Sequence, residues 1–170
     1  MLPPSAHFRP APVRVAALAH SLRGHLADTG LIRLYVIAFT LMGSFVTVYN
    51  YLTYRLAAPP FSLSPAVIVG GLVLLTIGFF AAHSVASGWV SRRARIAPAQ
   101  ASALYLFAYY LGSSICGSAG GLPYGHGGWD VTVVFVAVLL LVGLGCALSL
   151  RSARRGPSPR ASAVPPPRSA

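Results

Sequence analysis

Long stretches without charge divide this chain. The 36 residues from Leu56 to Ser91 include no Asp, Glu, Lys or Arg, and the same is true of residues 34–54, 96–129 and 131–150. A helix that crosses the hydrocarbon core of a bilayer needs about 20 predominantly apolar residues. The pattern therefore predicts an all-α, polytopic membrane protein with four transmembrane helices.

Arginines, prolines and glycines set the expected boundaries. We expect spans at about 34–54, 66–90, 98–122 and 130–150, which form one transmembrane domain over residues 34–150. Residues 65–90 reach about 39 Å as a helix, enough for one tilted span and too short for two. Residues 151–170 are predicted to be a disordered, basic, Pro-rich tail, because nothing in them can be buried.

Residues 1–33 are expected to form a cytoplasmic lead. Apolar and basic positions alternate along it at helical spacing, from Arg14 and Val15 through Leu18, Leu22 and Arg23 to Leu26. One interpretation is an amphipathic helix on the membrane surface, and the other is an ordinary cytoplasmic linker.

Composition supports the membrane assignment. Hydrophobic residues make up 55% of the chain and charged residues 9%, against about 25% charged residues in soluble domains. The formal charge of +11 comes from arginines beside the hydrophobic stretches, where positive charge sets orientation against an anionic cytoplasmic face. The expected partner is the lipid bilayer, and nucleic acid is not expected.

Arginine clusters before the first span, between the second and third and after the fourth predict that both termini are cytoplasmic. The expected location is a bacterial inner membrane. Loops 56–64 and 123–129 then lie outside. Two aromatic belts are expected at the membrane surfaces: Tyr51, Tyr54, Tyr124 and Trp129 outside, and Tyr35, Trp89 and Tyr105 inside.

Small residues recur every fourth position on two spans. Such faces let helix backbones approach closely in lipid, so both stripes are predicted to pack against other helices. The stripes are Gly78, Ala82 and Ala86 on the second span, and Ser113, Gly117 and Gly121 on the third.

Few polar side chains lie inside the spans, and none is a carboxylate. His83 is the notable one, because an imidazole within the membrane needs a cavity or a partner. It either handles protons or makes structural hydrogen bonds, with Tyr109, Tyr110, Ser113 and Ser114 as the expected partners. The full set of candidate cavity residues is Tyr49, Asn50, His83, Tyr109, Tyr110, Ser113 and Ser114.

Catalytic chemistry is not indicated. Cys116 and Cys146 lie in hydrophobic runs without further metal ligands nearby, and no nucleophile with a base or phosphate-binding loop is visible. We expect no cofactor, no metal site and no enzymatic activity.

Three long strings resemble the C-terminal half of major facilitator superfamily permeases. They are LMGSFVTVYNYLTYRL, GFFAAHSVASGWVSRRA and QASALYLFAYYLGSSICGSAGGLPY, in that order. The resemblance covers roughly residues 27–150 and is nearest to bacterial inner-membrane permeases of the arabinose- or drug-efflux type.

The resemblance implies a fold of two six-helix halves that rock about a central cavity, usually driven by a proton gradient. The four spans resemble the seventh, tenth, eleventh and twelfth helices of that fold. FSLSPAVIVGG passes from the start of an eighth helix into a tenth, which implies an internal deletion, and the N-terminal half has no counterpart. Because a substrate site between two repeats needs both of them, the resemblance predicts an incomplete efflux permease for an unknown small molecule.

Such a chain would need missing helices from another chain or self-association to complete a site. The alternative is a small four-span protein that acts as an oligomer, or as a structural or regulatory partner without transport. Small multidrug-type transporters also have four spans, but they rely on a membrane-embedded Glu that this chain lacks.

Overall fold

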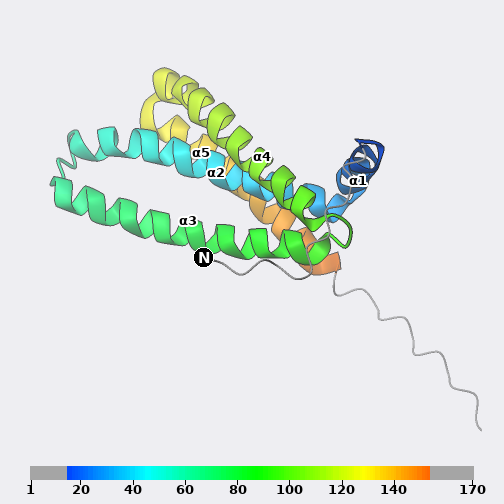
Figure 1. Cartoon of the computed structure of the whole chain (residues 1–170). Helices are drawn as coiled ribbons and strands as arrows, with labels where there is room; N and C mark the ends of the chain where they lie inside the picture. The colour runs from blue at the N-terminus through cyan, green and yellow to red at the C-terminus, as the bar shows by residue number, and fades with distance from the viewer. Residues whose placement is uncertain (1–14, 154–170) are drawn as a thin grey trace, which may run out of the picture.

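The computed structural model describes residues 15–153, and these form five α-helices without a strand (Figure 1). The helices are α1 (Val15–Ala27), α2 (Thr29–Ala57), α3 (Pro65–Arg93), α4 (Pro98–Ala119) and α5 (Gly121–Ala153). The protein is an all-α membrane protein, as predicted. The predicted flexible tail and the first part of the lead lie outside the described residues.

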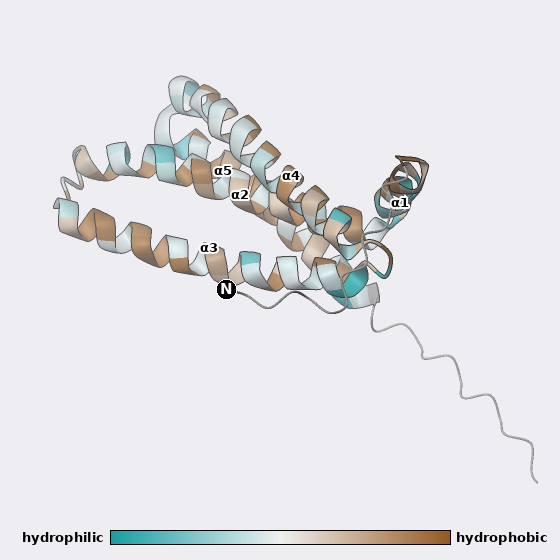
Figure 2. Ribbon diagram, viewed as in Figure 1, coloured by the Kyte–Doolittle hydropathy of each residue, from teal (hydrophilic) through white to brown (hydrophobic). Residues whose placement is uncertain are grey.

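Three of these helices, α2, α3 and α5, are both long and apolar enough to cross a bilayer. Hydrophobic residues run along most of their length, and strongly hydrophilic ones lie mainly near helix ends (Figure 2). The remaining predicted span corresponds to α4, whose 22 residues extend about 33 Å. Its tyrosines and serines make it less apolar than the others, so four spans remain a prediction.

α2 begins earlier than the sequence pattern suggested. The first span was expected to start at residue 34, after Arg33, but the helix starts at Thr29 with Asp28 as its N-cap. The Asp28 carboxylate accepts hydrogen bonds from the first free backbone N–H groups of α2. The helix therefore begins at the Asp28 cap and continues through Arg33, and the charge of Arg33 does not mark its start.

The last connection is also more helical than predicted. Residues 123–129 were expected to be a loop, but α5 already begins at Gly121 and is interrupted only at Gly127 and Gly128. Gly128 has a φ of 62°, which a residue with a side chain rarely adopts. A two-glycine kink thus separates a short helical turn from the long apolar part of α5.

α1 forms a separate surface helix within the predicted lead. It lies against the start of α4, where Gln100 Nε2 donates a hydrogen bond to the Leu18 carbonyl at 3.1 Å and Gln100 Oε1 accepts one from the Ser21 hydroxyl. The Leu18 and Leu26 side chains remain about half exposed. The helix itself is therefore present, and its contact with a membrane surface remains a prediction.

α2 is the central helix, and its closest partner is α4. A Cβ at Gly43 would lie only 2.7 Å from Cys116 Sγ, and one at Gly112 would collide with the Phe39 carbonyl oxygen. Thr47 Oγ1 donates to the Cys116 carbonyl of α4 at 3.0 Å. Small residues and one interhelical hydrogen bond thus fix this pair, as is typical of helices in lipid.

α3 and α5 pack on α2 but not on each other. In the described part of the chain, no Cα atom of α3 lies within 8 Å of one in α5. Two apolar pockets, of about 540 and 260 Å³, occupy the space between them, with residues of α2 as their floor. α3 and α5 therefore form the walls of an open apolar groove, which we call the α3–α5 groove.

The two ends of the bundle differ in charge. Six of the seven described arginines lie at the end that carries α1, the α3–α4 connection and the C-terminus of α5, and only Arg55 lies at the other end. At that other end the Tyr51 and Tyr124 rings stack at 4.8 Å. The expected inner belt is wrong for Tyr35 and Tyr105, which are buried between helices instead of facing the membrane surface.

Candidate functional site

His83 lies in the wall between α3 and α4, four residues from the midpoint of α3. Its Nδ1 is 3.2 Å from the Tyr105 hydroxyl, and its ring centroid is 4.9 Å from that of Tyr109. Tyr105 is only 2% exposed. The imidazole is therefore half-buried and held by hydroxyl and ring contacts, with no charged partner beside it in the described structure.

A continuous row of rings links three helices at this site. Phe45 of α2 stacks on Phe79 of α3 with centroids 4.3 Å apart, and Phe79 lies 6.0 Å from His83. Phe79 also approaches Tyr109 of α4 at 6.1 Å. Such ring pairs prefer defined geometries, so the row fixes His83 more firmly than the single hydroxyl contact alone.

The structure brings together only two of the predicted cavity residues, His83 and Tyr109. Tyr110 is 63% exposed and its ring packs on Tyr109, Ser114 is exposed, and Ser113 is half-buried one turn beyond Tyr109. The predicted hydroxyl partner was therefore wrong. Tyr105 supplies it because Tyr105 lies one helical turn before Tyr109, on the same face of α4.

Tyr49 and Asn50 form no part of this cluster. Both are exposed and lie in the C-terminal half of α2. The Tyr49 ring packs on Phe45 at 5.9 Å, and Asn50 lies near the backbone of Gly117 on α4. Any cavity that included all the predicted residues would need to extend along the bundle toward the end that carries Arg55.

A pocket of about 380 Å³ opens beside His83. It lies between α3 and α4 and is lined by Tyr105 and by three serine side chains. Its volume falls in the range of sites that hold small molecules, roughly 300–1,000 Å³. The polar pocket lies on the opposite side of α3 from part of the apolar α3–α5 groove, so α3 separates two different surfaces.

The two predicted packing stripes have different environments. In the stripe predicted on the third span, Cβ atoms at Gly117 of α4 and at Gly121, the first residue of α5, would lie 2.8 and 3.1 Å from side chains of α2, but the tightest approach is at Gly112, one residue before Ser113. Of the three stripe residues on α3, only Ala86 is buried. Gly78 and Ala82 face the α3–α5 groove instead of a helix, because α5 diverges from α3.

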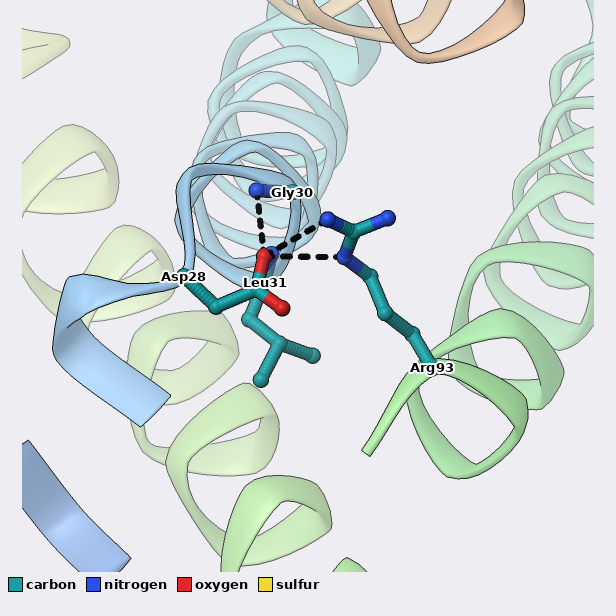
Figure 3. Close-up of polar contacts among 4 residues, drawn as sticks. All are labelled: Asp28, Gly30, Leu31 and Arg93. Carbon is teal, nitrogen blue, oxygen red and sulfur yellow. Dashed lines mark hydrogen bonds and ion pairs between the residues drawn. The ribbon is translucent and has the colours of Figure 1, made fainter. Parts of the chain in front are cut away.

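One ion pair joins the start of α2 to the end of α3 (Figure 3). Asp28 Oδ1 accepts from the Gly30 and Leu31 N–H groups at 2.7 and 3.2 Å, and Arg93 Nη2 lies 2.8 Å away. Burial raises the pKa of Asp28, but Arg93 and the two N–H groups outweigh this and hold the pKa below its ordinary value. The pair therefore stabilises the fold at neutral pH, and that contribution is lost only below about pH 4.

No group of three His, Cys, Asp or Glu side chains in residues 15–153 is placed to hold a metal ion. Cys116 is buried against α2, Cys146 is half-buried in α5, and both are free thiols. Their surroundings agree with a packing role.

Several important residues were missed by the sequence analysis. Gly43, Thr47 and Gly112 carry the α2–α4 contact, and Tyr105 carries the contact with His83. Gly112, Cys116 and Gly120 recur at the same four-residue spacing as the predicted stripe of Ser113, Gly117 and Gly121. Only the crossing of α2 over α4 decides between two stripes one residue apart.

Comparison with known proteins gives relatives over most of the chain. It is 37% identical to an uncharacterised MFS-type transporter, YybF, of Bacillus subtilis over 84% of this chain and 48% of the relative. It is also 37% identical to the inner membrane transport protein YnfM of Escherichia coli over 85% of this chain and 47% of the relative. An uncharacterised transporter of Buchnera aphidicola is 31% identical.

No family model matches the chain, and no solved structure matches it. The relatives are named transporters, and the chain spans about half the length of the curated relatives that it matches. Over most of its length, the chain is therefore homologous to about half of a membrane transporter of the major facilitator type.

Proposed function

We propose that this chain is a membrane transport protein of the major facilitator type, similar to proton-coupled efflux permeases for small molecules, and that it is an incomplete copy. The observation that carries the proposal is the 37% identity to YybF and YnfM over 84–85% of the chain. Identity at this level across several helices reflects common ancestry, whereas a shared apolar composition alone would not maintain it.

The length of the alignment supports an internal deletion. The match to YybF covers 195 positions, whereas 84% of this 170-residue chain is about 143 residues. About 50 aligned residues of the relative thus have no counterpart here, which is enough for two membrane spans of about 20 residues with a loop. Loss of two spans leaves the orientation of every later helix unchanged, so the arginine pattern remains compatible with insertion.

The contacts of α3 agree with a join inside this helix. From Phe79 onward it packs on α2 and α4 through Phe79, Ala86, Val90 and the His83 contacts, whereas Ile68 is the only buried residue before Phe79. We place the join near the start of α3, because FSLSPAVIVGG covers residues 61–71 and the helix begins at Pro65. An abrupt change of helix there would leave few native neighbours for the residues before it.

We assign His83 to the wall of the transport cavity, with a structural role. It lies beside a polar pocket and has tyrosine contacts, and both carboxylates of the chain, Asp28 and Asp130, are near helix ends. A hydrogen-bonded imidazole can stay neutral there. In a complete permease, His83→Gln should therefore keep transport and its pH profile, while a shifted or flattened profile would assign proton transfer to His83.

A chimera tests the transport proposal. The matching half of YnfM is replaced by this chain, either as it is or with the roughly 50 residues of YnfM restored at the gap. Proton-driven movement of ethidium and of radiolabelled arabinose is measured in energised, inverted membrane vesicles. We expect the restored chimera to transport at least one of the two probes. The chimera without the 50 residues should transport neither.

A matched chimera that carries the same half of YybF serves as the positive control. If that control moves a probe while the restored chimera inserts but moves neither, the proposal is wrong. Transport by this chain alone in proteoliposomes would contradict the proposed incompleteness. It would favour the alternative of a small protein that acts as an oligomer.

A further inference from the structure

A polar pocket of about 500 Å³ lies at the arginine-rich end of the bundle, away from His83. It is formed where α1 faces the end of α3 and the α3–α4 connection. His20 and His25 of α1 line one side, and Arg92, Arg93 and Arg95 line the other. We call it the basic pocket, and nothing in the transport proposal uses it.

The basic pocket has more positive charge than the protein neutralises. Arg93 is paired with Asp28 (Figure 3), but Arg92 and Arg95 make no ion pair within residues 15–153. The whole chain has only one other carboxylate, Asp130, which lies at the opposite end of the bundle. Two guanidinium groups at this pocket therefore lack an acidic partner on the chain, apart from its C-terminal carboxylate.

His25 provides an independent sign that a ligand belongs here. This side chain lines the pocket and is only 5% exposed, yet its Nε2 atom has no hydrogen-bond partner in the described structure. A buried polar atom without a partner is unfavourable, so it indicates a missing group. In the tautomer that carries its hydrogen on Nε2, the group that complements this N–H beside guanidinium donors is an oxygen acceptor.

These features match the chemistry of phosphate. Arginine forks bind phosphate oxygens through paired, charge-assisted hydrogen bonds, and a phosphate has oxygens left over for an imidazole. The exposed Leu18 and Leu26 on α1 next to the pocket suit the boundary between headgroups and acyl chains. We propose that the basic pocket binds a phosphate group at the membrane surface, through Arg92, Arg95 and His25.

Two sources could supply this phosphate: the headgroup of an anionic phospholipid or free inorganic phosphate. Native mass spectrometry of the full chain in detergent separates them. The protein is titrated with dioleoyl-phosphatidylglycerol, with dioleoyl-phosphatidylcholine, whose headgroup is zwitterionic, and with inorganic phosphate. We expect phosphatidylglycerol to bind at least tenfold more tightly than phosphatidylcholine.

The residues are tested with Arg92→Gln/Arg95→Gln and with His25→Gln, which keeps a polar amide in place of the ring. We expect the double variant to bind phosphatidylglycerol at least tenfold more weakly and His25→Gln to bind it severalfold more weakly. Arg55→Gln, at the opposite end of the bundle, is the matched control and should bind as the unmodified protein does. All variants are first compared by gel filtration, so that loss of folding is recognised.

If the unmodified protein binds inorganic phosphate and the same variants lose this binding, the site is supported and its ligand is the free anion. Equal binding of phosphatidylglycerol and phosphatidylcholine, without phosphate binding, overturns the proposal. The same holds if the folded double variant retains full affinity for every phosphate probe that the unmodified protein binds.

Discussion

His83 illustrates what a sequence can reveal about one side chain and what it cannot. Its position inside an uncharged stretch predicted an interior imidazole that needs a partner. The identity of the partner depends on the rotation of α4 about its axis, and this placed Tyr105 opposite His83 while Tyr110 turned outward. Successive residues of a helix point in directions about 100° apart, so a small rotation of α4 about its axis changes which tyrosine faces His83. The sequence therefore predicted that His83 needs a partner, but not which hydroxyl supplies it.

A double-mutant cycle measures the contact between these two residues. We expect His83→Leu and Tyr105→Phe to show a coupling free energy of about 0.6 kcal/mol, typical of polar contacts within membrane proteins. Reversible unfolding in mixed detergent micelles provides the four free energies of unfolding. Additive effects would mean that the 3.2 Å contact contributes nothing.

The cycle with Tyr110→Phe in place of Tyr105→Phe is the control. Tyr110 is 63% exposed, and its ring packs against Tyr109 and not against His83. We therefore expect its effect to add to that of His83→Leu. Equal coupling in both cycles would indicate a general loss of α4 packing instead of a specific hydrogen bond.

At the scale of the helix, the small residues of α3 and α4 have different packing environments. Both sequences show them every fourth position, and both were predicted to pack. On α4, Gly112 approaches the backbone of α2 and Gly117 approaches the Val46 side chain, whereas a Cβ at Gly70, Gly71 or Gly78 of α3 would have no neighbour within 4 Å. Spacing alone indicates where a close approach is allowed, and the crossing of helices decides where one occurs.

Gly112→Ala should therefore lower stability far more than Gly71→Ala. The methyl group at Gly112 would collide with the Phe39 carbonyl oxygen, which cannot move without shifting α2. We expect a loss of roughly 1–3 kcal/mol, the usual cost of overpacking a well-packed contact. Thermal unfolding of the detergent-solubilised protein, followed by fluorescence-detected gel filtration, gives the comparison.

Gly71→Ala is the matched control, because a Cβ at Gly71 meets open space. Its melting temperature should stay the same or rise slightly, since Ala favours a helix more than Gly. If both variants melt together, the α2–α4 contact is not the tight interface that the structure describes.

For the whole molecule, hydropathy and charge were the most informative sequence features. They predicted an all-α membrane protein and the gathering of arginines at one end, and the described helices agree with both. They did not predict the helical start of α2 or the α3–α5 groove. The first depends on the Asp28 cap, and the second depends on distances between segments far apart in the chain.

Reporter fusions test the orientation that the arginines predict. Alkaline phosphatase, active only outside the cytoplasm, is fused after Pro60, Ile96, Tyr124 and Ser152, and a fluorescent protein, active only inside, is fused at the same sites. We expect phosphatase activity after Pro60 and Tyr124, and fluorescence after Ile96 and Ser152. Fluorescence from the Tyr124 fusion would show that α4 does not cross the membrane and leave three spans.

The central position of α2 has a consequence for biosynthesis. α2 is made before its main partner, since the hydrogen bond from Thr47 to Cys116 joins residues 69 positions apart. Within the described residues, α3 is the one long helix made between α2 and α4, and the atoms that a Cβ at Gly43 would meet belong to α4 and not to α3. The loose attachment of α3 thus keeps a docking surface open for a helix that the ribosome has yet to deliver.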